Sequence, residues 1–516
     1  MNGKNWTATP LLAGLLALAL GLPCAAAAQD SAPAAAEQKA EEKKAPEMSS
    51  GAQLLPGTPG AELFGPQPVY TESYDAEAQL AVYDKKYMNK TAFPPIDLGL
   101  QLYERGAYDP RPTWLGTKNP MMPAVMAYGD LRVATAAYDN GIPDAKGKTD
   151  HSEVAARLNL DIDMALTATE RIHAFVRPLD RNGSFTRYMF DSGAKDHFVE
   201  ELNFQLKTLF FEGDLGQIAT GLSHRTNGLD MPIAVGRVPI ATQNGIWIDD
   251  AFDGAAVGLF TAKNNPAHDI SNTDLTLFAG FNNVATAAVP GDRANIFGLA
   301  GFADAFKGYV EYGYGYVDAD NPDLSYHNLT AAFSRRYWGR IANSIRVIGN
   351  FGQKGLAGQQ KTADGVLVLV ENSFLPRYLP WGNVLNLVPY VNLFGGFRSP
   401  QSLARAADAG GVLRNTGINF ESDGLTAYPT LDATARDSYG GAFGVEYLFN
   451  LDRQIVVEGA VVQRRGNNPL GDQYALGARY QHPISNAWIL RLDAMRGWRQ
   501  GLKDIYGARV ELRRKL

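Results

Sequence analysis

From Ile96 to the end of the chain, one kind of segment repeats. Each segment has about ten residues of alternating polarity and ends at Gly, Asn, Asp or Pro. Alternation places successive side chains on opposite faces of a β-strand. Turn-forming runs such as 180–183 and 466–469 separate the segments, as expected for hairpins. Helical periodicity is hard to find in this region, so the sequence predicts an all-β protein.

The pattern assigns each side chain to a face. In the segment 488–498, Leu490 lies on the apolar face and Arg491 on the polar one, and Leu160 and Arg157 are separated in the same way. The alternating segments are Val154–Leu166, Phe198–Phe210, Asn328–Arg336, Tyr439–Phe449, Gln473–His482, Trp488–Trp498 and Ile505–Leu516.

A water-soluble β-sandwich also alternates, but three features favour a membrane barrel. The polar faces carry charges of both signs. Aromatic residues such as Tyr439, Phe449, Trp488 and Trp498 stand at segment ends on the apolar face, where barrels place their aromatic girdles. No soluble-domain break interrupts the pattern. In lipid only a closed barrel pairs every strand edge. Roughly 420 residues predict about 16–18 antiparallel strands: 18 if Asp97–Glu104 is the first strand, 16 if it is not.

The first 28 residues have the form of an export signal. Lys4 supplies the positive charge, Leu11–Leu22 the apolar core and Ala26–Ala28 the A-x-A cleavage site. The alternative is lipidation of Cys24. A lipoprotein signal has Leu three residues before the cysteine and a small residue directly before it, whereas this chain has Gly21 and Pro23 there. We therefore expect cleavage after Ala28 and export across the inner membrane.

We divide the mature chain into two parts. Residues 29–95 form an N-terminal periplasmic segment: as far as Ser50 it is rich in Ala, Glu, Lys and Pro and lacks aromatic residues, as in a disordered tail. The stretch to Pro95 is rich in Pro, Gly and Tyr, and a plug, a strap and a linker remain open for it. Residues 96–516 form the barrel.

With this leader, these segments and the terminal strand Tyr506–Leu516, the chain resembles Gram-negative outer-membrane porin-type β-barrels. One departure is the last residue, which is Leu516 where such barrels commonly end in Phe, with Arg514 two positions before it. The resemblance implies a barrel in the cell outer membrane, in contact with lipid and lipopolysaccharide, that passes small polar solutes.

Several functions are disfavoured by the residues themselves. The net charge of −6 provides no basic surface for nucleic acid, and a chain cleaved after Ala28 has no cysteine. The seven histidines are scattered, without metal-ligand spacing. Ser223 and His224 are adjacent, so on a strand they would point to opposite faces and could not act as a catalytic pair. We expect no enzyme activity, no cofactor and no metal.

The candidate functional residues are charged side chains on the predicted inner faces. Two interpretations remain open: an ion-pair lattice that stiffens the wall, or a constriction that selects ions. Nine arginines against six carboxylates would favour anions. The candidates are Arg157, Asp161, Asp163, Arg171, Arg177, Glu201, Arg336, Arg346, Glu446, Arg479, Arg491, Asp493, Arg509 and Glu511, with Arg513 as the ninth arginine.

The function expected from these observations is diffusion of small polar, and by charge anionic, solutes. The alternative is a barrel that serves as a scaffold or conduit for a partner, such as a periplasmic electron carrier or an exported acidic polysaccharide, with residues 29–95 as the docking element. Assembly with further copies of the chain is also open. The Gly-Tyr alternation of Tyr309–Tyr316 fits either a sugar-stacking surface or an aromatic girdle.

Overall fold

The computed structural model describes residues 95–98, 111–118, 124–144, 147–181, 183–190, 197–225, 227–265, 270–282, 284–289, 291, 293–374, 387–406, 411–421, 425–449, 453–466 and 471–516. All of them belong to one compact unit, Leu80–Leu516. The expected export signal, and the tail as far as residue 94, lie outside the described residues.

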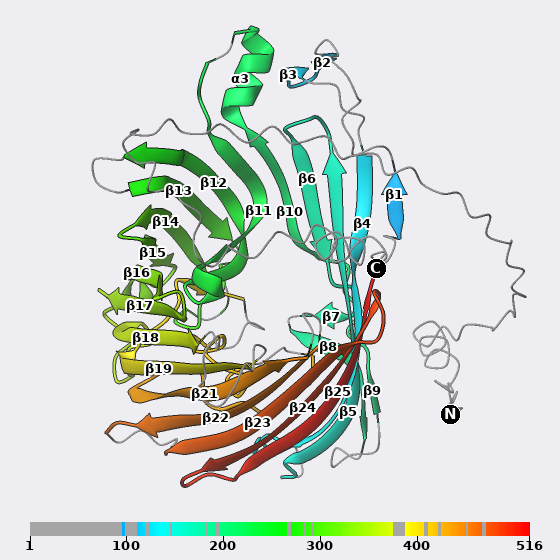
Figure 1. The fold of residues 1–516 in the computed structure, drawn as a ribbon, viewed down its shortest axis with the longest axis vertical. Coiled ribbons are helices and arrows are strands. Elements are labelled where there is room, and N and C mark those ends of the chain that lie inside the picture. The colour runs from blue at the N-terminus through cyan, green and yellow to red at the C-terminus, as the bar shows by residue number, and fades with distance from the viewer. Residues whose placement is uncertain are drawn as a thin grey trace, which may run out of the picture. The chain divides into compact units, whose positions relative to one another are not determined.

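Within this part of the chain, eighteen strands form a closed antiparallel ring (Figure 1). The first ring strand pairs with the last, Lys515 opposite Asp130, so the wall has no free end. In order around the ring the strands are β4 (Ala124–Asp139), β5 (Asp150–Ala165), β6 (Arg171–Val176), β10 (Leu206–Asp214), β11 (Pro232–Thr242), β12 (Ile248–Asn265), β13 (Ile270–Asn282), β14 (Ala294–Ala305), β15 (Gly308–Ala319), β16 (Tyr326–Tyr337), β17 (Ile341–Phe351), β18 (Asp364–Phe374), β19 (Leu387–Ser399), β21 (Ser438–Leu448), β22 (Gln454–Arg464), β23 (Gln473–Pro483), β24 (Trp488–Arg499) and β25 (Ile505–Lys515).

The all-β prediction and the upper strand number are confirmed, but the reason given for eighteen is wrong. The first ring strand is β4, whereas β1 (Ile96–Leu98) is a short strand that pairs beside the start of β4. The expected strand 198–210 is also wrong. The chain there forms β9 (His197–Val199), then residues without strand structure, then β10, so Glu201 lies on no strand.

The predicted faces are confirmed where strands are regular. In β25, Tyr506, Ala508 and Val510 are exposed while Arg509 and Glu511 are buried. A ring that exposes its apolar face and encloses its charged face is suited to a bilayer. Apolar side chains exposed on the outer face include Leu329, Val347, Leu393, Phe443, Val457, Leu476 and Val510. No helix in the described residues is long and apolar enough to span a membrane.

The two rims of the ring differ. The start of β4 and the end of β25 lie at one rim, which we call the terminal rim; the opposite rim is the loop rim. Connections at the terminal rim include two residues between β14 and β15, whereas 38 residues (400–437) connect β19 and β21 at the loop rim. Outer-membrane barrels differ at their two rims in the same way, with short turns on one side and long loops on the other.

In the described ranges, one helix and several short strands lie outside the ring of eighteen strands. Helix α3 (Leu215–Ser223) follows β10 at the terminal rim and is capped by the Asp214 carboxylate. Gly116, in the hairpin of β2 (Arg111–Thr113) and β3 (Gly116–Lys118), lies so close to the backbone of Gly221 that a β-carbon would not fit. Strands β7 (Asp180–Arg181), β8 (Ser184–Phe190) and β9 extend the wall beside β5.

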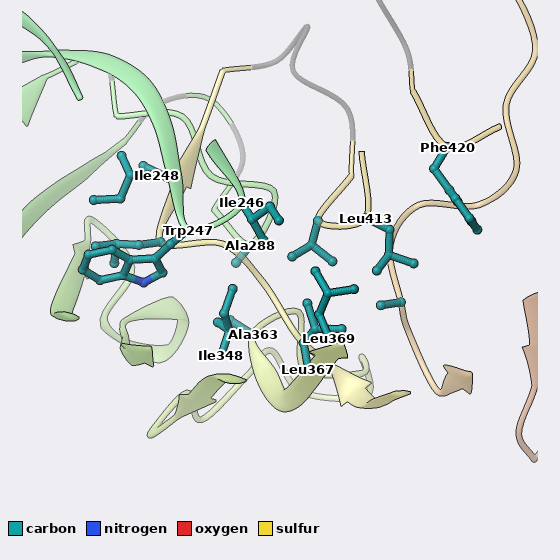
Figure 2. Packing of buried hydrophobic residues seen from close by; sticks show 14 of the residues in the cluster. Ile246, Trp247, Ile248, Ala288, Ile348, Ala363, Leu367, Leu369, Leu413 and Phe420 are labelled. Atoms are coloured by element: carbon teal, nitrogen blue, oxygen red, sulfur yellow. The ribbon is translucent and has the colours of Figure 1, made fainter. Parts of the chain in front are cut away.

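In the long connection between β19 and β21, residues 400–406, 411–421 and 425–437 are described and fold back against the inner wall; we call them the belt. Its short strand β20 (Ala404–Arg405) runs parallel to the start of β12, and Leu403 N donates to Trp247 O at 2.8 Å. Leu413 and Phe420 of the belt join a buried cluster with Trp247 and Leu367 (Figure 2). Part of the lumen is therefore filled by an apolar core instead of water.

Two glycines on the inner face of β15 make room for this core. A β-carbon at Gly313 would meet the Trp247 ring at 2.2 Å, and one at Gly315 would meet Leu403 at 2.3 Å. Tyr312, Tyr314 and Tyr316 lie on the outer face, where the Tyr314 hydroxyl forms a hydrogen bond with His327 Nδ1 at 2.7 Å, whereas Tyr309 shares the inner face with the two glycines. Three of the four tyrosines in the Gly-Tyr run thus fit the aromatic-girdle interpretation, and only Tyr309 of this run faces the lumen.

Candidate functional site

A cluster of arginines surrounds Asp493 on the lumen face of β23–β25. The Asp493 carboxylate accepts from Arg479 Nε at 2.8 Å, from Arg491 Nε at 2.9 Å and from Arg509 Nη2 at 2.8 Å. These side chains meet because the register puts Arg479 and Arg509 directly opposite Asp493 on its two neighbouring strands. The Asp493 side chain is only 5% exposed, so its charge is matched by guanidinium groups instead of water.

The same wall continues the basic surface onto β4 and β5. Arg132 and Glu511 form a bidentate pair with N···O distances of 2.8 and 2.7 Å, and Arg513 Nε lies 3.0 Å from Asp130 Oδ2. Arg157 donates to Asn159 and lies over the Phe185 ring. We call the following residues the arginine patch: Arg132, Arg157, Arg479, Arg491, Arg509 and Arg513 with their partners Asp130, Asp493 and Glu511.

The belt adds one more carboxylate to the patch. Glu421 Oε2 lies 2.6 Å from Arg479 Nη1 and Glu421 Oε1 lies 3.6 Å from Arg491 Nη2. Next to it the Arg509 guanidinium stacks at 5.3 Å over the ring of Tyr428, which also belongs to the belt. The patch is therefore lined by two chain segments, the barrel wall and an inward-folded loop.

Acidic residues occupy the wall half a ring away, on β13–β15. Asp274 and Glu311 both stand opposite Phe302, and Asp304 accepts from Asn272. Glu311 and Arg491 are each the fourth residue from the terminal-rim end of their strands. Basic and acidic walls thus face each other across the ring, the arrangement that gives a transverse field in a pore.

A second acidic group lies beside the patch on β5 and β6. Asp161 lines a cavity of about 370 Å³ together with His173 and Phe210. Asp163 pairs with Arg171 at 3.3 Å, and the His173 ring stacks on Phe210. Asp161, Asp163 and Arg171 all lie on the lumen side, but they belong to this group and not to the arginine patch.

The structure disperses the remaining candidates. Arg177 lies beyond β6 and forms a buried pair with Asp180 at 2.9 Å, so it belongs to the loop rim. Glu201 packs beside Thr186 off the ring. Arg336 and Glu446 lie near the terminal-rim ends of β16 and β21. Arg346 is 2% exposed and pairs with Glu371 at 3.0 Å.

Sequence reasoning overlooked many inward carboxylates, and the expected arginine excess does not extend to the whole lumen. It is a local property of the patch. A signal existed for Asp130, which precedes Arg132 at the alternate position of the same strand. The overlooked carboxylates are Asp130, Glu153, Glu212, Asp274, Asp304, Glu311, Glu371, Glu421 and Glu458. Within the described part of the chain, no group of His, Cys, Asp and Glu could hold a metal ion.

One of these carboxylates, Glu458 on β22, anchors the belt. It is 1% exposed and accepts from Ile418 N and Asn419 N, both at 2.9 Å, and from Tyr390 Oη at 2.5 Å. Nearer the start of the belt, burial and the neighbouring Arg414 lower the pKa of Arg405 to about 10, which leaves that guanidinium charged at neutral pH.

Replacement of Glu458 with Gln should loosen the belt without opening the barrel. An amide has one acceptor oxygen instead of two, so at least one buried N–H would lose its partner at a cost of about 1–3 kcal/mol. We expect trypsin to cut the belt of the variant faster than that of the wild type, while the heat-dependent gel shift of the barrel is retained. Equal cleavage rates would show that Glu458 does not hold the belt.

A closed ring of eighteen antiparallel strands, with an apolar outer face and a charged lumen, is the fold of an outer-membrane β-barrel of the porin type. Barrels of this kind are found in outer membranes.

No family model and no curated protein sequence matches the chain. Solved structures of similar fold include three from Pseudomonas aeruginosa. OccK3 (OpdO) has 11% identity and a TM-score of 0.46 and covers 76% of this chain and 95% of its own. OccK2 (OpdF) has 12% identity and a TM-score of 0.47, and the match covers 76% of this chain and 97% of OccK2. OpdK with vanillate has 12% identity and a TM-score of 0.46, and the match covers 76% of this chain and 98% of OpdK.

Proposed function

We propose that the protein is a channel through which small polar solutes diffuse across the outer membrane, and that the arginine patch draws their anionic groups. The observation that carries this proposal is the concentration of six arginines on β23–β25, β4 and β5, opposite an acidic wall. Guanidinium groups match carboxylate and phosphate oxygens in pairs. No catalytic step is part of the proposal.

The patch would act where the belt narrows the path. The belt follows the inner wall from β12, where β20 pairs, to β5, where Ala427 N donates to Glu153 at 3.1 Å. A solute that passes the belt therefore passes the arginines as well. A scaffold for a partner protein would not require charges to be sorted onto opposite walls, so the sorting favours passage.

Reconstitution into planar bilayers tests the proposal. We expect steady conductance steps, and reversal potentials in a salt gradient that show chloride favoured over potassium at low salt. The preference should fade near 1 M salt, where the screening length is about 3 Å. Preference for potassium would mean that Asp161, Asp274 and Glu311 govern the field, and absence of conductance would favour the scaffold alternative.

A further inference from the structure

Two carboxylates bind the same arginines in different ways. Asp493 belongs to the wall, is 5% exposed and is held by three guanidinium groups. Glu421 belongs to the belt, is 29% exposed and, among the described residues, forms ion pairs with Arg479 and Arg491. Asp493 is thus a fixed part of the patch, whereas Glu421 covers its accessible side.

We propose that Glu421 is a built-in counter-ion that oxyanion groups of passing solutes displace from Arg479 and Arg491. The inference rests on the proposed function and adds the residue that sets how tightly anions are held. The Glu421 carboxylate lies between two guanidinium groups, at 2.6 and 3.6 Å, where a solute carboxylate would lie if it reached the patch.

Displacement requires only the side chain to rotate. The preceding residues fix the belt backbone: Asn419 is 1% exposed and is bound to Glu458 through its backbone and its amide, and Phe420 is 1% exposed in the apolar core. The Glu421 side chain is partly exposed and has three rotatable bonds. The exchange therefore leaves the belt in place, and the two arginines keep their bonds to Asp493.

The local charge balance explains why such a competitor is useful. With Glu421 in place, Arg479, Arg491 and Arg509 face two carboxylates, and one positive charge remains. When Glu421 turns away, two positive charges remain for the incoming anion. A channel must bind its solute strongly enough to admit it and weakly enough to release it. Return of Glu421 would provide that release.

Glu421→Gln tests the proposal in planar bilayers with chloride and benzoate as probes. Loss of one charge about 6 Å from the anion path corresponds in water to a factor of about three. We expect the chloride-to-potassium permeability ratio to rise about threefold at low salt. The benzoate concentration that halves the chloride current should fall by a similar factor. Glu421→Ala should change both measurements in the same direction. Agreement of the two variants would show that the lost charge, and not the new amide group, causes the effect.

Asp323→Asn is the matched control. It removes one negative charge from the connection η5 (Pro322–Leu324) at the loop rim, where Asp323 is 51% exposed and lies 3.6 Å from Lys354. This variant should leave both measurements unchanged. In an Arg491→Gln background, Glu421→Gln should have a smaller effect, because one of its two partners is already gone.

The outcomes separate this inference from the proposed function. A wild-type protein that does not conduct overturns the proposed function. A wild-type protein that conducts, with Glu421 variants that resemble it or bind benzoate more weakly, overturns only the role of Glu421. Trypsin cleavage of the belt at the wild-type rate shows that the variants keep the belt folded. Faster cleavage together with a changed selectivity would assign Glu421 a structural role and would also overturn the inference.

Discussion

Replacement of Asp493 with Asn is expected to lower the free energy of unfolding by about 3 kcal/mol, because removal of one partner leaves buried charges unmatched. Arg479, Arg491 and Arg509 all bind this carboxylate, and Arg509 is only 2% exposed. The loss should be measurable as a lower urea midpoint for the change in gel mobility between the folded and unfolded barrel.

Two further variants show whether charge is the cause. Adding Arg509→Gln to Asp493→Asn removes the most buried of the three guanidinium groups and should restore part of the stability. Asp304→Asn on the acidic wall, where the partner is the neutral Asn272, should cost about 1 kcal/mol or less. If Asp493→Asn is as stable as the wild type, water in the lumen already screens the cluster.

Arginine on the outer face should destabilise the barrel as strongly. Val510 is the sixth of eleven residues in β25 and is 44% exposed on the apolar face. In a membrane this position contacts lipid near the middle of the wall, so Val510→Arg should cost about 2–4 kcal/mol. Urea unfolding in lipid vesicles measures the loss.

The matched control places arginine on the inner face. Ser344 lies on the lumen side of β17 directly opposite Glu371. A guanidinium at this position could therefore be solvated and could pair with the Glu371 carboxylate. Ser344→Arg should cost much less than Val510→Arg. Equal losses in the two variants would mean that the strand faces are not divided between lipid and lumen as the burial pattern indicates.

The faces of the regular strands could be read from the sequence because a period of two survives wherever both faces have a constant environment. For this reason the alternation puts Arg491, Asp493, Arg509 and Glu511 on the face of β24 and β25 opposite to the exposed apolar residues. The wall register then brings them together, which explains why the centre of the arginine patch was predictable.

The acidic wall was not predictable, since its strands depart from simple alternation. In β13 the register shifts between Ser271 and Asp274, so the side-chain faces cannot be counted across it. In β15 the inner positions include Gly313 and Gly315, which accommodate Trp247 and Leu403 from distant segments. A glycine in sequence does not reveal which side chain will fill its space.

The belt could not be found from periodicity either. Its contacts are single hydrogen bonds to remote wall residues, such as those of Glu458 with Ile418 and Asn419, and its packing uses isolated apolar residues. Such a segment follows the shape of the cavity that receives it, so Glu421 acquires its position only after the wall exists. The count of nine arginines against six carboxylates left out the carboxylates of the belt and of the acidic wall. It therefore overestimated the positive charge of the lumen.

The pairing of β25 with β4 has a consequence for biogenesis. Arg132 and Glu511 are 379 residues apart, yet they lie on neighbouring strands. Until the last strand has been synthesised and exported, β4 keeps an unpaired edge that can pair with other chains. The entropy of closing so long a loop grows only slowly, by about 0.6 kcal/mol for each doubling of length, so the obstacle is chiefly one of time. A chain truncated before β25 should therefore be a substrate for periplasmic chaperones and proteases and not a smaller pore.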